Sequence, residues 1–321
     1  MNNKKGKWFV IIALGVFIVG MIFCIVMSIY NWDFTKLQTT KYETNDYKIN
    51  KKFDNISILT DTADIIFVPS ENEKTTITCY EQQNVLHTVS AKEDTLSIEI
   101  NDTRKWYEYI GISFSTPKIT VNIPVDKYNS LTICSDTGII EIPDEYIFEN
   151  IDIKATTGSV AINASAKGSF KVKTSTGNIS VANANAGTID LSVSTGKISV
   201  SNLNCVGKAS FTATTGETEL HNLKCGNLNS EGSTGSIVLE NVIAKTKFSI
   251  LRDTGDIIFN KSDAAEIIAE TDTGDIKGTL LSDKIFLVET DTGRINVPKT
   301  TRGGKCEIKT DTGDIDVRIE N

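Results

Sequence analysis

Residues 175–200 read STGNISVANANAGTIDLSVSTGKISV, and this stretch contains two copies of one short pattern. In each copy, a Ser-Thr-Gly triplet precedes apolar residues that alternate with polar ones, as Ile179 and Val181 do after Gly177. Alternation with a period of two is typical of a β-strand with one buried face. The stretch therefore predicts short strands separated by a turn at the Thr-Gly pair.

The Thr-Gly pair recurs along the chain at spacings of 19 or 20 residues. Its glycines are Gly138, Gly158, Gly177, Gly196, Gly216, Gly235, Gly255, Gly274, Gly293 and Gly313. A second alternating run lies seven and five residues before most of them, as Phe170 and Val172 do before Gly177. Two strands in a coil of about 20 residues can form a core only if equivalent strands stack about 4.8 Å apart. Because crossover chirality favours one winding, the pattern predicts an all-β, right-handed parallel β-solenoid of 19–20-residue coils over residues 136–321.

The phase of the apolar residues changes at each Thr-Gly pair, so the chain must turn a corner there. Glycine supplies a backbone conformation with positive φ without a side-chain clash. The threonine before it is expected to share the core-facing phase of its strand, which argues against ice binding through a threonine face. The coil from Gly216 to Gly235 is expected to be the weakest, because Thr218, Ser230 and Gly232 occupy its core-facing positions.

The N-terminus contains a long apolar segment. Residues 8–30 hold no charged side chain, and 23 helical residues reach about 34 Å, enough to cross a bilayer core. Lys4, Lys5 and Lys7 precede this segment without an acidic residue. The positive-inside rule then predicts a cytoplasmic tail (1–7), a transmembrane signal anchor (8–30) in the cell membrane, and an extracytoplasmic remainder. The alternative is a cleaved secretory signal, whose apolar core would be about 7 to 15 residues long.

Two segments separate the apolar run from the regular repeats. Residues 31–52 are polar without an apolar period and are expected to be a tether. Residues 53–135 are rich in alternating runs but depart from the strict period, and we expect irregular N-terminal coils that cap the membrane end of the solenoid. Residues 60–65 read TDTADI, which looks like the corner motif with Ala63 in place of glycine.

Three stretches carry a family resemblance: ADIIFVPS (63–70), KITVNIPVDKYNSLTI (118–133) and SDTGIIEI (135–142). They resemble the bacterial "putative adhesin" family of β-strand-repeat proteins, over about residues 53–321. LiaG-like members of that family sit in cell-envelope stress operons, so the resemblance implies a bacterial surface protein linked to envelope sensing or maintenance. The family has no established catalytic residues to carry over.

Charge and cysteine content argue against two classes of protein. The formal net charge is −8 at pH 7, and because three N-terminal lysines carry +3 of it, the rest of the chain carries −11. This balance disfavours a nucleic-acid partner. Five of the six cysteines follow the apolar segment, too few and too odd in number for a disulfide framework. Cys205 and Cys225 each lie nine residues after a glycine, so they should stack on adjacent coils, either bridged or as two buried apolar residues.

No catalytic site is expected. The Asp-Thr-Gly tripeptide of aspartic proteases occurs at Asp136, Asp253, Asp272, Asp291 and Asp311. That chemistry needs two aspartates facing one another at about 3 Å, whereas these lie one coil apart at a repeated corner. The only histidines are His87 and His221, and neither has metal-ligand spacing. The glycines punctuate strands and form no phosphate-binding loop.

Two functions remain. As a binding, adhesion or scaffold module, the rod would offer ladders of outward side chains to an envelope protein or a cell-wall polymer. As a calcium-stabilised structural rod, it would bind the ion through its acidic corners; the metal candidates are Asp253, Asp256, Asp272, Asp275, Asp311 and Asp314. Capping of the turn backbone is favoured over a metal site, with Arg294 pairing with Asp275 or Asp314. No other cofactor is expected, and residues 315–321 are expected to form the exposed end of the rod.

Overall fold

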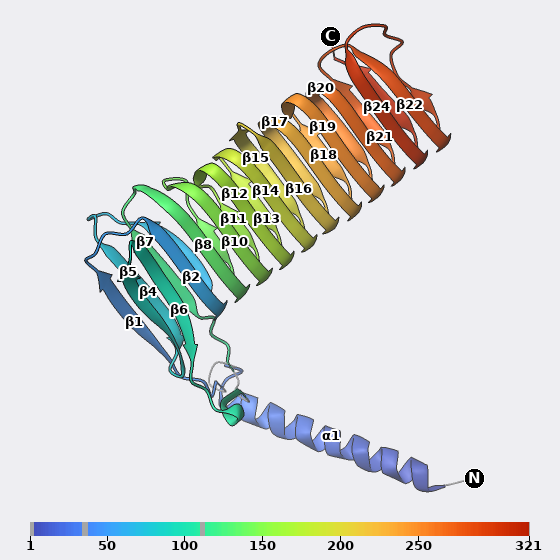
Figure 1. Cartoon of the computed structure of the whole chain (residues 1–321). Coiled ribbons are helices and arrows are strands. Elements are labelled where there is room, and N and C mark those ends of the chain that lie inside the picture. Colours follow the sequence, from blue (N-terminus) through green and yellow to red (C-terminus); the bar gives the residue numbers. More distant parts are fainter. Residues whose placement is uncertain (1–2, 34–37, 110–112, 321) are drawn as a thin grey trace.

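The computed structural model describes residues 3–33, 38–109 and 113–320. Part of the expected tail (1–2), part of the expected tether (34–37) and Asn321 at the expected exposed end lie outside the described residues. Figure 1 shows one long helix joined to a rod of stacked strands, with the N- and C-termini at opposite ends. The predicted all-β solenoid with one N-terminal apolar helix is confirmed.

The helices are few and the strands are many. Helix α1 spans Asn3–Ile29, and the 3-10 turn η2 spans Trp106–Tyr109. The strands are β1 (Tyr42–Ile49), β2 (Asn55–Thr62), β3 (Asp64–Pro69), β4 (Thr75–Gln82), β5 (Val85–Lys92), β6 (Thr95–Asp102), β7 (Lys118–Ile123), β8 (Lys127–Thr137), β9 (Ile140–Ile142), β10 (Ile147–Thr157), β11 (Val160–Ile162), β12 (Ser165–Thr176), β13 (Ile179–Ala182), β14 (Asn185–Thr195), β15 (Ile198–Cys205), β16 (Lys208–Thr215), β17 (Thr218–Thr234), β18 (Ile237–Glu240), β19 (Ile243–Thr254), β20 (Ile257–Thr273), β21 (Ile276–Leu280), β22 (Lys284–Thr292), β23 (Ile295–Asn296), β24 (Gly304–Thr312) and β25 (Ile315–Ile319).

Coils from β8 to β21 stack in sequence order and in register. Ile151 pairs with Phe170, and Phe170 pairs with Ile189 on the next coil, so equivalent apolar residues form continuous buried columns. The corner glycines are required by both conformation and space. Gly177 has a φ of 135°, and a Cβ atom there would lie 2.0 Å from the carbonyl oxygen of Gly158. Any side chain at this corner would therefore push adjacent coils apart.

A second corner is formed by asparagines that the sequence interpretation did not identify. Asn183, Asn202, Asn222 and Asn241 have φ values of 52–54° and lie six residues after successive corner glycines. Their side-chain amides donate to one another along the rod, at Nδ2–Oδ1 distances of 2.9, 2.9 and 3.1 Å. Asparagine tolerates left-handed backbone better than most residues, so the ladder satisfies both the turn and its own amides.

The last two coils stack out of sequence order. β24 lies between β20 and β22, and β25 lies between β21 and β23. The rod therefore ends at β22 and β23, and the expectation that residues 315–321 form its exposed end is wrong. Gly303 and Gly304 allow the insertion, because Cβ atoms there would lie 1.8 Å from the carbonyl oxygens of Asp283 and Ala265 respectively.

A buried ion pair spans the inserted coil. Lys284 is paired with Gly304 on β24, and its ammonium group reaches Asp263 on β20, with 2.6 Å between Nζ and Oδ1. Lys284 is buried, and its side chain reaches Asp263 although strand β24 lies between β20 and β22. Because breaking a buried pair leaves an uncompensated charge, this contact favours the observed coil order.

The N-terminal end also departs from sequence order. β2 lies between β6 and β8, and β3 lies between β7 and β9, with Ala63 at the corner position. Antiparallel strands then cover this end: β5 pairs with β6, β4 with β7, and β1 with β4. The expectation that residues 31–52 form a tether is therefore wrong for strand β1. This strand joins the sheet, and its Tyr47 and Ile49 pack against the core.

The coil expected to be weakest contains a buried arginine. Arg252 projects from the next coil into the space beside Thr218, Ser230 and Gly232. Its guanidinium donates to Ser230 Oγ at 2.9 Å and to the carbonyl of Leu251 at 2.8 Å. Burial lowers the pKa of Arg252 to about 10. The small and polar residues of this coil are therefore a socket for one large side chain, not a packing defect.

Candidate functional site

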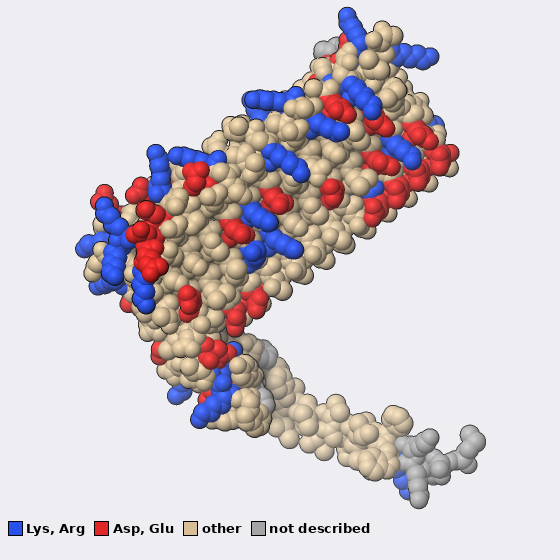
Figure 2. All heavy atoms as spheres, viewed as in Figure 1, with Lys and Arg blue, Asp and Glu red and all other residues tan. Residues whose placement is uncertain are grey.

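The acidic edge lies along the Thr-Gly corners in the C-terminal half of the rod. We define it as the aspartates one residue after the glycine (Asp256, Asp275 and Asp314) and those two residues before it (Asp253, Asp272, Asp291 and Asp311). Figure 2 shows acidic side chains gathered along this edge toward the C-terminal end. The edge contains all six aspartates that the sequence nominated as metal candidates.

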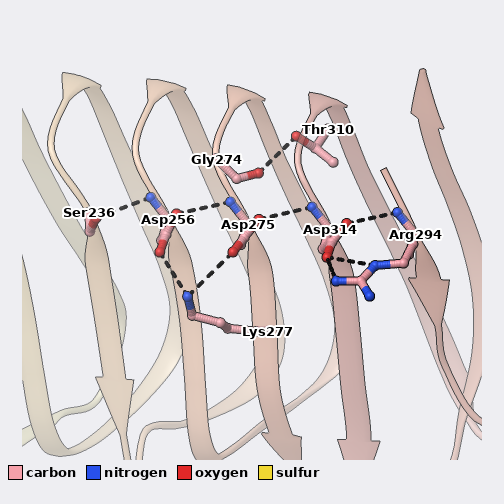
Figure 3. A network of polar contacts seen from close by, with 8 residues as sticks. All are labelled: Ser236, Asp256, Gly274, Asp275, Lys277, Arg294, Thr310 and Asp314. Carbon is pink, nitrogen blue, oxygen red and sulfur yellow. Dashed lines mark hydrogen bonds and ion pairs between the residues drawn. The ribbon is translucent and has the colours of Figure 1, made fainter. Parts of the chain in front are cut away.

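The aspartates after the glycines cap the backbone of the neighbouring coil. Asp256 Oδ1 accepts the N–H of Asp275, Asp275 Oδ1 accepts that of Asp314, and Asp314 Oδ1 accepts that of Arg294, each at 2.9 Å (Figure 3). Ser236 provides the same contact to Asp256 through its hydroxyl, at 3.1 Å. The corner thus has a ladder of side-chain-to-backbone hydrogen bonds that joins neighbouring coils.

Two cations reduce repulsion along this ladder. Lys277 Nζ lies 2.9 Å from Asp256 Oδ2 and 3.6 Å from Asp275 Oδ2. Arg294 lies 2.6 Å from Asp314 at the outer end of the ladder, since its coil is the last in space (Figure 3). Of its two expected partners, Arg294 therefore takes Asp314.

The same contacts shift two carboxyl pKa values downward. Burial alone would raise the pKa of Asp256, but hydrogen bonds from the Asp275 N–H and from Lys277 outweigh it, so this pKa lies below its ordinary value. The side-chain and backbone hydrogen bonds of Arg294 lower the pKa of Asp314. Both groups are therefore held in the charged form that accepts hydrogen bonds.

The aspartates before the glycines are exposed and follow one another along the rod, with Asp311 3.8 Å from Lys309. Neighbouring corners are parallel and in register, so these aspartates sit side by side on successive coils. Such an arrangement differs from the facing pair that proton sharing requires in an aspartic protease.

The threonines directly before the glycines are exposed, contrary to the core-facing phase expected for them. Together with Thr62, which precedes Ala63, they pair in register along the rod in the order Thr62, Thr137, Thr157, Thr176, Thr195, Thr215, Thr234, Thr254, Thr273, Thr312 and Thr292. The chain already turns at these residues, so two successive side chains before each glycine point outward. We call this row the threonine column.

A buried polar cluster lies in the N-terminal end of the rod, around one of the two histidines. His87 is buried; its Nδ1 lies 2.7 Å from Glu81 Oε2 and its Nε2 lies 2.9 Å from Thr60 Oγ1. Asn45 donates to the other oxygen of Glu81 at 2.9 Å, so each polar group has a partner. Glu81 lies on β4 and His87 on β5, two antiparallel strands at the N-terminal end of the rod. These strands do not follow the repeat, so no spacing in the sequence indicates the cluster.

Cys79 completes a group with ligand atoms within 4.8 Å of one another: Cys79, Glu81 and His87, which are all buried. Burial raises the pKa of the Cys79 thiol to about 12, so without a metal ion the thiol is protonated at neutral pH. Thr60, the hydroxyl in line with His87, is also buried within strand β2. The hydrogen bonds of this cluster join β2, β4 and β5, and His87 borders a cavity of about 380 Å³ near Tyr42 and Arg104.

The sequence also named the stacked cysteines Cys205 and Cys225 and the second histidine, His221. Cys205 and Cys225 are buried free thiols on adjacent coils, as the pairing of Asn204 with Lys224 places them. Burial raises the pKa of Cys225 to about 12, in keeping with two stacked apolar residues. His221 lies 2.9 Å from Glu240 on the partly exposed surface.

These features define a class of repeat protein, a β-solenoid rod with an N-terminal apolar helix and regular outward ladders. Residues 53–222 and 206–321 match the family model described as Toastrack DUF4097, and the chain belongs to that family. This membership confirms the resemblance found in the sequence. No match was found among the curated proteins.

Two solved structures share this fold. A "putative lipid binding protein" of Parabacteroides distasonis has a TM-score of 0.53 and 18% identity, covering 75% of this chain and 98% of its own. A "putative adhesin" of Parabacteroides merdae has a TM-score of 0.53 and 14% identity, covering 75% of this chain and 97% of its own. The printed names of both neighbours are those of binding or adhesion proteins.

Proposed function

We propose that the chain is a membrane-anchored, extracytoplasmic β-solenoid that acts without catalysis as a binding or scaffold protein of the cell envelope. The observation that carries this proposal is the helical segment Lys7–Ile29, which is long and apolar enough to span a membrane and whose most apolar 18 residues are not buried. An apolar surface of that size is unfavourable in water. A bilayer would cover it, and the lysines before it favour a cytoplasmic N-terminus.

The binding role is supported by the surface of the rod. Its threonine column and acidic edge repeat with the coil spacing, and such ladders suit an extended partner such as a cell-wall polymer or an envelope protein. The names of the two structural neighbours point to adhesion and lipid binding. The resemblance to LiaG-like proteins adds the link to the envelope-stress response.

Protease treatment of intact cells tests the anchor and its direction. A chain with an epitope tag at each end should lose the C-terminal tag to external protease and keep the N-terminal tag in the membrane fraction. A C-terminal tag that resists protease in cells without an outer barrier would contradict the orientation. Release of the whole rod into the medium, cut from its helix by the cell, would instead identify a cleaved signal.

The control reverses the charges that set the orientation. Substituting Lys4→Glu, Lys5→Glu and Lys7→Glu removes the positive residues and leaves the apolar segment unchanged. This variant should lose the uniform orientation, because positive charge near the helix is what retains the N-terminus in the cytoplasm.

A further inference from the structure

Large aromatic side chains are exposed on η2 and just after it. Trp106 is 78% exposed, Tyr109 58%, and Tyr107 and Phe114 51% each. We call these four residues the aromatic loop. Soluble surfaces rarely gather apolar groups in this way, and such a patch marks a contact with a membrane or a partner.

The base of the aromatic loop is held in a fixed conformation. Arg104 donates to Asp102 through Nε at 2.9 Å and Nη2 at 2.6 Å, and its guanidinium lies 4.3 Å from the Tyr109 ring centroid. The Tyr109 hydroxyl donates to Asp102 at 3.0 Å, and the Lys105 N–H donates to Glu108 at 2.9 Å. Arg104 and Asp102 thus neutralise one another at the base, while the rings stay exposed.

The aromatic loop lies where the rod meets the apolar helix. Figure 1 shows η2 at the end of the rod nearest α1. Glu108 borders the same cavity as residues 39–41, and Ser113 accepts or donates a hydrogen bond at 2.7 Å to Tyr42. The chain segment that leaves the helix therefore runs beside the loop.

The helix end carries exposed aromatics of its own. Tyr30 and Trp32 follow Ile29 and are 37% and 56% exposed. Tryptophan and tyrosine concentrate at the bilayer interface, where their rings are half-solvated among lipid headgroups. Two sets of aromatic residues, far apart in sequence, thus lie at the same end of the molecule, where the proposed membrane surface would be.

We propose that the aromatic loop inserts into the interfacial region of the outer membrane leaflet and forms, with the helix, a second contact that sets the orientation of the rod. This rests on the membrane anchoring proposed above. A single helix leaves a rod free to tilt about its tether, whereas two contacts restrict that motion. The ligand is the lipid interface itself, met by rings and not by a charged pocket.

The chain offers a direct test, because its only tryptophans are Trp8, Trp32 and Trp106. The full chain is reconstituted in vesicles of phosphatidylcholine and phosphatidylglycerol that contain lipids with a spin-label quencher near the headgroup or near the acyl end. Trp8→Phe with Trp32→Phe leaves Trp106 as the reporter, and Trp32→Phe with Trp106→Phe leaves Trp8. We expect Trp106 to be quenched more by the shallow label than by the deep one and to be protected from iodide.

The two reporters separate the possible failures. Quenching of Trp8 by lipid labels with full iodide access to Trp106 would overturn the aromatic-loop contact and leave the anchor intact. Lack of lipid quenching at both positions would overturn the anchor itself. Protection of Trp106 from iodide without quenching by either lipid label would assign the loop to a protein contact and would also overturn the proposal.

Discussion

The two ends of the rod solve the same problem in different ways. At each end, one strand lies out of sequence order. At the N-terminal end β2 lies between β6 and the rest of the rod, and at the C-terminal end β24 lies between β22 and the rest of the rod. The N-terminal end is then covered by the antiparallel strands β1, β4 and β5. At the C-terminal end, β22 and β23 each have a hydrogen-bonded neighbour on one side only among the described strands.

This difference leaves one closed end and one open end. The open end carries exposed apolar side chains on its last strands, at Ile285, Leu287 and Ile295. Its core-phase residues Phe286 and Val288 are only partly buried. Open parallel edges offer unpaired backbone groups, so natural proteins usually cover them. The comparison shows that a regular solenoid core does not fix how its ends are finished.

The largest effect is expected from removing the inserted coil. Deletion of residues 300–321 removes β24 and β25, the only hydrogen-bonded partners of β22 and β23 in the described part of the chain. The coil of β22 and β23 should therefore unfold as well, although only the coil of β24 and β25 is deleted. Hydrogen exchange followed by mass spectrometry should show full loss of amide protection over residues 284–296 and normal protection over β13.

A sequential solenoid would give a different result. If β22 kept its protection in the shortened chain, it would have docked directly on β20, and the observed coil order would not matter for stability. The ion pair between Lys284 and Asp263 argues against such docking, because it forms with strand β24 between the two strands that carry these residues.

A matched pair of core substitutions sharpens the contrast between the middle and the open end. Val172 and Val288 both lie five residues before a corner glycine, but Val172 is fully buried and Val288 only partly. Val172→Asp should lower the free energy of unfolding by roughly 4 kcal/mol, because it buries an unpaired carboxylate. Val288→Asp should cost about 1–2 kcal/mol, because the carboxylate keeps access to water.

Local opening energies from native-state hydrogen exchange would measure both variants. Lys171→Asp, an outward change beside Val172, is the control and should stay within about 0.5 kcal/mol of the parent. Equal losses at Val172 and Val288 would mean that the tip is covered in solution. Equal losses at Val172 and Lys171 would refute the inward and outward assignment of the strand.

The regular middle of the rod was predictable because one pattern repeats there. The spacing of the glycines and the period of two in residues such as Phe170 and Val172 set coil length, strand phase and burial. The coil order at the ends was not predictable, because β22 and β24 have the same pattern and a pattern does not select a neighbour. The signal that existed was the Gly303-Gly304 pair, together with apolar residues at the outward positions of β22.

The buried polar groups were harder to predict for a related reason. His87 lies on the antiparallel strand β5, which is not part of the sequence repeat. Its environment therefore depends on contacts between residues far apart in sequence. Arg252 was accessible to sequence reasoning in principle, since it occupies a core phase beside Ser230 and Gly232. The threonine column was wrongly expected to face the core. That expectation extended the alternation of inward and outward side chains one residue beyond the point where the chain turns.

The smallest effect is expected at the acidic edge, and it depends on pH with a definite sign. Asp256 and Asp314 have lowered pKa values in the folded chain, so their contribution to stability is present above the ordinary aspartate value of 3.8 and is lost as pH falls through the lowered value. The melting temperature should thus show no change due to this edge between pH 7 and 5, and a decrease below about pH 4.

The rod itself contains the neutral version of the capping contact. At an earlier corner, Asn178 Oδ1 accepts the N–H of Lys197 at 3.0 Å, the same contact that Asp275 makes to Asp314. An amide oxygen is therefore sufficient for capping. Asp272→Asn with Asp275→Asn should cost roughly 0.5–1 kcal/mol, because partly exposed ion pairs contribute little.

Calcium provides the decisive comparison for this edge. The carboxylates of Asp256, Asp275 and Asp314 already accept backbone N–H groups and face Lys277 and Arg294, whereas calcium needs six to eight oxygen ligands. We therefore expect calcium to raise the melting temperature of the purified chain no more than magnesium does at equal ionic strength. A calcium-specific rise of many degrees that disappears in the double asparagine variant would contradict this expectation. It would mean that a bound ion stabilises the open end of the rod, whereas strand pairing stabilises the closed end.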